Sequence, residues 1–466
     1  MQTTFKKLSY RDKCATVYRK NSLVFRFISS QYEPAYRKLM KSGLYKHLTE
    51  EGLLVCHEEV EAPDSLGERH DDFQTVIKPC KIPFISYPYE WCFSQLKDAA
   101  LLTLRIQKLA LAYGMTLKDA NAWNVQFHGG KPVFIDTSSF EIHEEGSPWS
   151  AYGQFCRFFL LPLVLMSKCE PRLNSLLLAY PDGIPLDIGI KLLPLSTWLN
   201  PSLIGHLAVT AFMNAHYRKS EGHGSDSKQR VKLQQLLNVL NDLEDTISNL
   251  RLKQEDSVWS AYYKDNAYSP KAFAAKEEIV QRILVQSKRK KIWDLGANTG
   301  HYSRLASPHA DMVLAMDYDA LCVENNYLAL KKQGKSNILP LLMDCTAPSP
   351  ALGWALLERL SLPERGPCDL LMALALIHHL VIGRSINLEE VAAYMAKLGQ
   401  ELIIEFVPED DSQVELLRKQ KAGVCQTYNQ TAFEEAFCSH FVLIDKQVIA
   451  DSKRMIYHFV RLSGDR

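Results

Sequence analysis

Residues 291–305, KIWDLGANTGHYSRL, place an acidic side chain beside a turn that contains two glycines. Asp294 ends an apolar run of strand length, Gly296, Asn298 and Gly300 form the turn, and the residues that follow suit the first turns of a helix. In an open α/β sheet, ligands bind beyond the carboxyl ends of the strands. A ligand is therefore expected over this turn.

The turn differs from the G-x-G-x-x-G pattern that brings a pyrophosphate close to a helix N-terminus. Asn298 replaces the middle glycine, and the carboxylate of Asp294 would repel a pyrophosphate. A ligand with a cationic amino group and a sulfonium would be attracted to that carboxylate, while the glycines let its carboxylate and sugar approach the backbone. S-adenosylmethionine has this chemistry and is the predicted cofactor.

Acidic residues also end the next two expected strands. The second strand ends in MDYD, where Asp317 is placed to accept hydrogen bonds from two ribose hydroxyls. The third ends in MDC, which places Asp344 and Cys345 near the adenine. Each aspartate alone could be an ordinary loop or cap residue. Three acids at three successive strand ends favour a nucleoside-binding sheet.

The fourth and fifth strands end where a methyl acceptor would react. The run ALALIHHL places Ala373 at the border of the transferred methyl group and His378 where a general base could act. Such a base is needed only if the acceptor must lose a proton. His378 and His379 could instead pack against or cap the following helix. In IIEFVPEDD, Glu405 could orient an acceptor. No metal site is predicted.

Short apolar strands alternate with amphipathic helices from residue 291 onward. This alternation predicts a doubly wound, Rossmann-like parallel sheet with right-handed crossovers. Strands are expected at KIWDLG, MVLAMDYD, ILPLLMD, DLLMALAL and ELIIEFV, with a helix near WALLERL. The closing stretch FVLIDKQVIADSKRMIYHFVRL predicts an antiparallel hairpin that ends the sheet.

Residues 291–462 resemble the class I S-adenosylmethionine-dependent methyltransferases. Their first motif is matched by Asp294, Gly296 and Gly300, and Asn298 departs from the usual glycine core. The resemblance implies that Asp317 binds the ribose and that Asp344 lies on the adenine side.

The whole chain also resembles a narrower group, the nodulation protein NoeA-like methyltransferases. The segments that carry this likeness are IPFISYPYEWCFSQLKDAA, NVQFHGGKPVFIDTSSFE, GIPLDIGIKLLP, ALALIHHL and IIEFVPEDDSQV. The resemblance implies methyl transfer and identifies no acceptor. A rival hypothesis is a non-catalytic nucleoside-binding protein with a kinase-like partner module.

A second constellation lies in TLKDANAWNVQFHGGKPVFIDTSS. Asp119 and Asn124 are five positions apart and Asp136 ends an apolar strand, which is the spacing of the catalytic acid and the metal-binding Asn and Asp of kinase-like phosphotransferases. However, Leu117 and Lys118 replace the usual histidine-containing approach, and neither a glycine-rich phosphate loop nor a phosphate-binding lysine is evident. A degenerate kinase-like lobe for scaffolding or acceptor binding is favoured over an active phosphotransferase, and a coincidence of loop residues stays open.

The polar stretch KSEGHGSDSKQR at residues 219–230 predicts an interdomain linker. It separates an N-terminal α+β domain at residues 1–218 from a methyltransferase domain at residues 231–466. The leucines of KLQQLLNVLNDLEDTISNLRL have helical spacing, and Ser269 with Pro270 could start a second helix. These helices, with Trp259, Tyr262 and Tyr268, could form a lid, although simple packing explains the aromatic spacing equally well.

The composition sets broad limits. The chain has 466 residues, 47% of them hydrophobic, and a formal net charge of +1, which argues against attraction to nucleic acid or to an anionic membrane. The eleven cysteines are scattered without a C-x-x-C pair, which favours reduced, mostly buried thiols of a cytoplasmic protein over disulfides or a zinc site. No apolar run is long enough to span a bilayer. The acceptor and the oligomeric state are not indicated.

Overall fold

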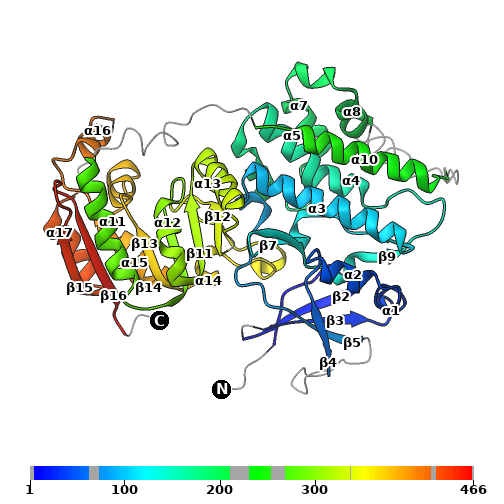
Figure 1. Cartoon of the computed structure of the whole chain (residues 1–466), viewed down its shortest axis with the longest axis horizontal. Helices are drawn as coiled ribbons and strands as arrows, with labels where there is room; N and C mark the ends of the chain where they lie inside the picture. The colour runs from blue at the N-terminus through cyan, green and yellow to red at the C-terminus, as the bar shows by residue number, and fades with distance from the viewer. Residues whose placement is uncertain are drawn as a thin grey trace. The chain divides into compact units, whose positions relative to one another are not determined.

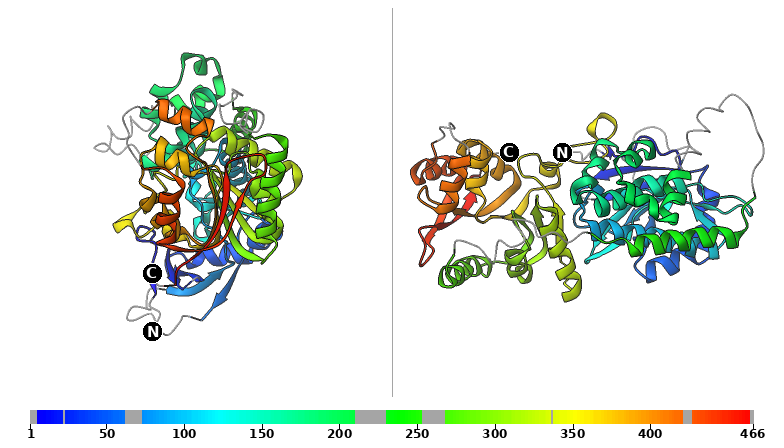
Figure 2. Two further views of the ribbon diagram at one scale, coloured as in Figure 1. Left: turned by 90° about the vertical axis from the view of Figure 1, so that its left-hand side faces the viewer. Right: turned by 90° about the horizontal axis from the view of Figure 1, so that it is seen from above.

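The computed structural model of the chain describes residues 5–21, 23–61, 73–209, 230–252, 268–335, 337–420 and 427–463. The chain forms two units (Figures 1 and 2). The first comprises Met1–Gln254 with Ala351–Arg359, and the second comprises Glu255–Pro350 with Leu360–Arg466. Apart from Arg230, the expected linker at residues 219–230 lies outside the described residues, as do Trp259 and Tyr262.

The second unit contains the expected doubly wound sheet (Figure 1). Its seven strands lie in the order β12-β11-β10-β13-β14-β16-β15; all neighbours are parallel except β16, which is antiparallel to β14 and β15. The strands are β10 (Arg289–Leu295), β11 (Ala310–Asp317), β12 (Ile338–Leu342), β13 (Cys368–Ala373), β14 (Gly399–Phe406), β15 (Phe441–Val448) and β16 (Met455–Arg461). The predicted antiparallel end hairpin is thus confirmed. Strand order reverses at β10, where a ligand crevice is expected.

Helices cover both faces of this sheet because successive residues of a strand point to opposite sides. Ile456 of β16 belongs to the core formed with α11, α12 and α13, whereas the ring of the next residue, Tyr457, meets Phe433 of α17 edge to face, with ring centroids 5.0 Å apart. The left view of Figure 2 shows the red hairpin between green helices on one side and orange helices on the other. The helices are α11 (Pro270–Leu284), α12 (His301–Ala306), α13 (Ala320–Gln333), α14 (Leu362–Arg365), α15 (Leu388–Leu398), α16 (Ser412–Gln420) and α17 (Gln430–Cys438).

The helix α11 begins where the sequence predicted. Ser269 is the N-cap, and its hydroxyl accepts a hydrogen bond from the backbone N–H of Ala272 at 3.1 Å. Pro270 occupies the first helical position, where a backbone N–H would have no partner within the helix, so its absence costs no hydrogen bond.

The first unit begins with an antiparallel sheet in the order β1-β2-β3-β5-β4. Its strands and the helices beside them are β1 (Lys6–Lys7), β2 (Ala15–Lys20), β3 (Leu23–Ser29), α1 (Glu33–Lys41), α2 (Leu44–Glu50), β4 (His57–Val60) and β5 (Phe73–Pro79). Ile28 and Ile77 pack with Tyr36 of α1, which anchors that helix to the sheet.

A mainly helical part follows in the same unit. It contains α3 (Phe93–Ala112), β6 (Met115–Leu117), β7 (Val125–His128), β8 (Lys131–Phe134), β9 (Phe140–Ile142), α4 (Tyr152–Phe155), α5 (Leu161–Lys168), α6 (Leu176–Ala179), α7 (Leu186–Leu192), α8 (Pro201–Leu203) and α10 (Leu233–Asn249). The hairpin β7–β8 and the pair β6–β9 flank the loops that carry the second constellation.

The helix α10 falls in the first unit, although the sequence analysis assigned it to the methyltransferase domain. It packs against α3, and the Nζ atom of Lys97 on α3 donates to the backbone carbonyls of Ser248 and Leu250 at 2.8 and 3.0 Å. A lysine at these carbonyls satisfies groups that a helix C-terminus leaves unpaired. This tertiary contact is invisible in the local sequence pattern.

Two other sequence expectations need correction. Cys56 and Cys80 form a disulfide because the antiparallel pairing of β4 with β5 brings their Cα atoms to 5.5 Å, so the expectation of free thiols is wrong for this pair. The segment WALLERL forms only a short 3₁₀ turn at Trp354–Leu356, where Ala355 has a φ of +52°. Arg359, at the end of this region, places its guanidinium over the Trp123 ring, with Cζ 4.8 Å from the ring centroid. The segment Ala351–Arg359 accordingly belongs to the first unit.

No helix among the described ranges combines the length and apolar character needed to cross a membrane.

Candidate functional site

A cavity of about 300 Å³ lies at the carboxyl ends of β10 to β13 in the second unit. Six of the eight predicted cofactor residues line it: Asp294, Gly296, Asn298, Asp317, Asp344 and Cys345. Gly300 and Ala373 are not part of the lining. The volume is at the lower end of the range for small-molecule sites.

The turn after β10 is held against β11. The backbone N–H groups of Gly296 and Ala297 both donate to the carbonyl of Met316, at 2.9 and 3.0 Å. Gly296 and Gly300 have φ angles of +70° and +78°, and Asn298 has +49°. Asparagine tolerates this left-handed conformation better than most residues, so its departure from the usual glycine keeps the turn geometry.

Asp317 fixes the turn from the neighbouring strand. Its Oδ2 accepts the backbone N–H of Asn298 at 2.7 Å, and its Oδ1 accepts the N–H of Asp319 at 2.9 Å. Burial raises the pKa of this carboxyl to about 6, although the backbone hydrogen bonds lower it. A carboxylate has about four acceptor positions, so acceptor capacity remains for ribose hydroxyls.

Asp294 is buried beneath the turn and accepts the hydroxyl of Ser303 at 2.6 Å. Burial raises its pKa to about 7; the Ser303 hydrogen bond lowers it, the nearby Asp317 charge raises it, and the Lys276 charge lowers it. Near neutral pH the group therefore exchanges readily between acid and carboxylate. A cation in the cavity would stabilise the carboxylate form.

The two glycines of the turn have different constraints. A Cβ on Gly296 would lie 3.3 Å from Cδ1 of Leu376, a cavity residue. A Cβ on Gly300 would lie 2.3 Å from Oδ1 of Asn326, which also accepts a hydrogen bond from Arg304 at 3.2 Å. Gly300 therefore makes room for a side chain of α13, whereas the sequence analysis expected it to make room for the cofactor.

The end of β12 lines another part of the cavity. Oδ1 of Asp344 accepts the backbone N–H and hydroxyl of Thr346 at 2.8 and 2.6 Å, and its Oδ2 lies 3.6 Å from Nη2 of Arg384. Desolvation, with added repulsion from Asp317 and Asp344, raises the pKa of the Cys345 thiol to about 12. Cys345 is therefore a neutral thiol at physiological pH.

The histidine pair is divided between core and cavity. His379 lines the cavity, whereas His378 is buried and neither of its ring nitrogens has a hydrogen-bond partner among the residues described. Burial lowers the pKa of both side chains, to about 4 for His379. Both rings are therefore neutral near pH 7, and the residue with access to a ligand is His379, to which the sequence analysis gave less weight than His378.

Glu405 lies behind the cavity in a buried ionic cluster. Its Oε2 is 2.7 Å from Nζ of Lys276, its Oε1 is 3.6 Å from Nη1 of Arg454, and the hydroxyl of Tyr268 donates to it. Asp411 pairs with Arg454 through Nε and Nη2, at 2.7 and 3.0 Å. Glu405 is fully buried and absent from the cavity lining, so contact with an acceptor would run through Lys276 or Tyr268, which do line it.

Sequence reasoning missed Lys276. Its ammonium group lies 4.9 Å from the ring centroid of Tyr268 and 4.8 Å from that of Tyr302. Burial lowers its pKa, while Glu405 raises it. The one local signal was the position of Lys276 on the buried face of α11, where a lysine needs a charged partner.

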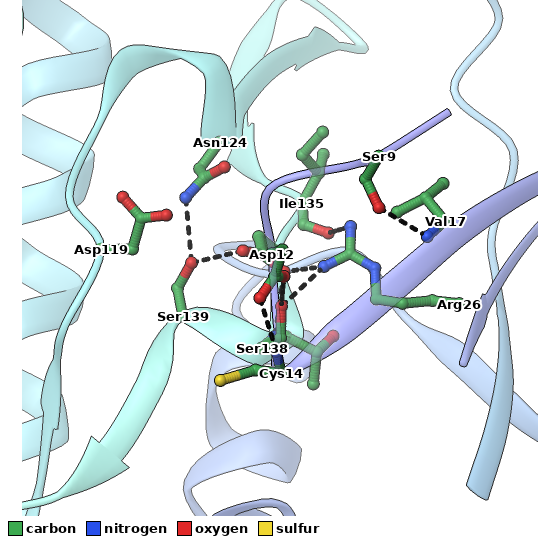
Figure 3. Close-up of polar contacts among 12 residues, drawn as sticks. Ser9, Asp12, Cys14, Val17, Arg26, Asp119, Asn124, Ile135, Ser138 and Ser139 are labelled. Carbon is green, nitrogen blue, oxygen red and sulfur yellow. Dashed lines mark hydrogen bonds and ion pairs between the residues drawn. The ribbon is translucent and has the colours of Figure 1, made fainter. Parts of the chain in front are cut away.

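The constellation of the first unit is also assembled (Figure 3). Asp119 and Asn124 lie in the loop between β6 and β7, and Asp136 follows β8. Asn124 and Asp136 share a partner, because Oγ of Ser139 accepts from the Asn124 amide at 2.9 Å and donates to the Asp136 carboxylate at 2.6 Å. Asp119 accepts from the amide of Asn121 at 2.6 Å.

The strand order and the glycine turn beneath an acid-lined cavity define the second unit as a doubly wound domain of mixed α/β class with an antiparallel end hairpin. The chain is 32% identical over 462 residues to nodulation protein NoeA of Rhizobium meliloti (strain 1021), a match that covers 97% of this chain and 95% of that protein. The chain therefore belongs to the NoeA family. No family model matches it.

Solved structures of methyltransferases resemble about half of the chain. N-methyltransferase NodS from Bradyrhizobium japonicum WM9, in complex with S-adenosyl-L-homocysteine, is 10% identical with a TM-score of 0.32 and covers 45% of this chain and 100% of its own. Magnesium protoporphyrin IX methyltransferase ChlM from Synechocystis PCC 6803, with bound S-adenosylmethionine, is 15% identical with a TM-score of 0.31 and covers 44% of this chain and 89% of its own.

Proposed function

We propose that the second unit binds S-adenosylmethionine in the cavity at the ends of β10 to β13 and transfers its methyl group to an acceptor that enters the same cavity. The observation that carries this proposal is the convergence of Asp294, Asp317 and Asp344, from three adjacent strands, on one cavity beneath a glycine turn. These residues fit the cofactor: two carboxyls with raised pKa values favour a cationic ligand over a pyrophosphate, and Asp317 keeps acceptor capacity for a sugar.

The residues that would hold the cofactor follow from their places in the cavity. Asp317 would accept the ribose hydroxyls, Asp344 and Cys345 would border the adenine, and Asp294 would face the amino end. When bound, S-adenosylmethionine supplies a methyl group that its sulfonium has already activated for displacement. The protein therefore acts mainly by orienting the two reactants and excluding water.

The acceptor side of the cavity is apolar with a few polar groups. Leu374, Leu376 and Leu380 line it with His379 and Lys276. The neutral His379 ring can accept a hydrogen bond from an acceptor, but with a pKa lowered to about 4 it is a weak general base, which suits an acceptor that need not lose a proton. Lys276 is fixed by Glu405 and can orient an acceptor oxygen without moving.

Calorimetric titration of the full chain with S-adenosylmethionine and S-adenosyl-L-homocysteine tests the binding step. Both ligands are expected to bind in a one-to-one ratio. Failure of both to bind would refute the proposal, and binding of NADH in their place would indicate a dinucleotide site.

Methyl transfer is tested separately, by incubating the protein and isotope-labelled S-adenosylmethionine with fractionated cell components and searching for labelled products by mass spectrometry. Asp317→Ala protein serves as the matched control. Cofactor binding without a labelled product in any fraction would favour the rival function, a nucleoside-binding protein without turnover.

A further inference from the structure

The polar cluster around Asp136 in the first unit has no part in methyl transfer as proposed. Arg26, on the central strand β3, forms an ion pair with Asp136, and the exposed fractions of the two side chains are only 11% and 12%. Nη2 of Arg26 also donates to the backbone carbonyl of Ile135 at 3.3 Å. A basic side chain from the sheet therefore faces the end of β8 (Figure 3).

Arg26 is a candidate for the phosphate-binding cation that the sequence analysis did not find. Kinase-like phosphotransferases place a basic residue on the third strand of their antiparallel sheet, facing the phosphates. The sequence showed no lysine for this role, but β3 is the third strand here and its inward cation is an arginine. A guanidinium suits phosphate at least as well as an ammonium, because its planar array of donors binds two oxygens at once.

The loop between β1 and β2 contacts the same polar cluster around Asp136. Oδ2 of Asp12 accepts the hydroxyl of Ser138 at 3.2 Å, and Oδ1 accepts the backbone N–H of Cys14 at 2.8 Å. In phosphotransferases of this kind a glycine-rich loop covers the phosphates. Here the loop has no glycine, and it brings the carboxylate of Asp12 close to Arg26. Burial lowers the pKa of Arg26, and the negative charge of Asp12 raises it.

The remaining groups are suited to a divalent cation. Asn124 and Asp136 meet at the hydroxyl of Ser139, which accepts from the Asn124 amide nitrogen and donates to the Asp136 carboxylate. Turning the Asn124 amide over would bring its oxygen to the same place. Amide and carboxylate oxygens are ligands that Mg²⁺ accepts, usually with water and phosphate oxygens completing the octahedron. Arg26 is one positive charge beside the two carboxylates of Asp12 and Asp136, so added positive charge would be favourable.

We propose that the first unit holds a second ligand site, for a nucleoside triphosphate with Mg²⁺. Asn124 and Asp136 hold the cation, Arg26 faces the phosphates, and the carboxylate of Asp12 occupies the place of a phosphate when the ligand is absent. Asp12 is exposed and sits in a loop, so it can leave as the ligand enters. Ser139 exchanges its contact with Asp136 for the cation.

The test titrates the full chain with ATP and with GTP, in the presence of Mg²⁺ and in its absence, by calorimetry. Asp12→Asn should tighten Mg²⁺-dependent binding by roughly tenfold, because it removes a like charge from beside the phosphates. Asp187→Asn is the matched control: this aspartate is exposed at the start of α7 in the same unit, and its loss should leave binding unchanged.

Two further variants locate the site. Arg26→Met and Asp136→Asn should each weaken binding at least tenfold, with circular dichroism used to confirm that the proteins are folded. Asp12→Asn keeps the test valid if these two variants misfold, because Asp12 is exposed. Asp317→Ala, in the second unit, should leave nucleotide binding unchanged while it weakens S-adenosylmethionine binding, which separates this proposal from the methyltransferase proposal.

Three results would overturn the second site. One is the lack of nucleotide binding by both wild type and Asp12→Asn protein, which would leave the Arg26–Asp136 pair as a purely structural contact. Another is binding that does not require Mg²⁺. The third is binding that is lost in Asp317→Ala protein, since the nucleotide would then occupy the cavity of the second unit.

Discussion

The backbone N–H of Asn298 donates to the carboxylate of Asp317 at 2.7 Å, so the turn after β10 and the end of β11 are joined by a hydrogen bond. The same carboxylate is the group proposed to bind the ribose. A ligand at Asp317 and the shape of the glycine turn are therefore coupled, and a change at Asp317 is expected to affect both.

Asp317→Ala is predicted to weaken S-adenosylmethionine binding by roughly 1.5 to 3 kcal/mol, the scale of hydrogen bonds to a charged group. Calorimetric titration measures the effect. Asp311→Asn is the control, because Asp311 lies on the same strand but is exposed and pairs with Lys288 at 3.2 Å. Unchanged affinity in a folded Asp317→Ala protein would show that another acid binds the sugar.

Cofactor affinity is predicted to rise with pH between about 6 and 8. The pKa of Asp294 is raised to about 7, so its carboxylate fraction grows across this range and attracts the cationic cofactor more strongly. Titrations at several pH values should show a several-fold increase. In Asp294→Asn protein the affinity should be lower and the increase shallower, with the remainder near pH 6 due to Asp317, whose pKa is raised to about 6. An equally steep increase would assign the effect to a group other than Asp294.

The stability of the ligand-free protein should change with pH in the opposite sense. The folded-state pKa values of Asp294 and Asp317 are raised to about 7 and 6, above the ordinary value near 4, so the folded state binds more protons than the unfolded state between about pH 4 and 7. The free energy of unfolding of the second unit should therefore fall as pH rises through this range. Urea unfolding of Asp294→Asn protein should show a shallower decline than wild type.

Replacing the two glycines of the turn is predicted to have different effects on stability and on cofactor binding. Gly300→Ala should destabilise the second unit by at least about 1–2 kcal/mol, the cost of a left-handed conformation, and by more because its Cβ meets Asn326. Gly296 has a φ of +70°, so Gly296→Val carries the same backbone strain, and it should in addition abolish cofactor binding, with the first unit still folded, because its side chain would enter the cavity. Thermal unfolding and cofactor titration of both variants separate the two effects. Cofactor binding by a folded Gly296→Val protein would contradict this distinction.

The ionic cluster behind the cavity is predicted to be coupled. Removing one partner of a buried pair leaves a charge uncompensated, at a cost of about 3–5 kcal/mol. Lys276→Met should cost less than Glu405→Gln, because Arg454 remains 3.6 Å from Glu405 when the lysine is lost. A double-mutant cycle by urea unfolding should show that the two substitutions together destabilise the protein by less than the sum of the single effects. Additive effects would mean that the pair makes no net contribution.

Local sequence signals accounted for the elements that carry the site. The apolar runs, the glycines and the aspartates at strand ends are short-range features, and they predicted the order of strand and helix, the end hairpin and six residues that line the cavity. The convergence of these aspartates was predictable because parallel strands bring their carboxyl ends to the same edge of a sheet.

The choice between the two histidines required the structure. The sequence placed both at the end of the fourth strand, but β13 ends at Ala373, and Ala375 takes a φ of +53° before the chain turns. This turn buries His378 and presents His379 to the cavity. Both histidines lie in the helical segment that follows this turn, so the packing of that segment decides which side chain faces a ligand, and the local sequence pattern does not define it.

The sequence by itself determined a doubly wound sheet with an acid-lined glycine turn, because hydrophobic periodicity and turn chemistry act over a few neighbouring residues. In the second unit, only the tertiary structure decided that Lys276 meets Glu405 and that Gly300 makes room for Asn326. In the first unit, it decided that α10 packs on α3 and that Arg26 faces Asp136. These contacts join residues that are far apart in the chain. They depend on which faces of separate elements meet, and that is set by packing of the whole unit rather than by any local pattern.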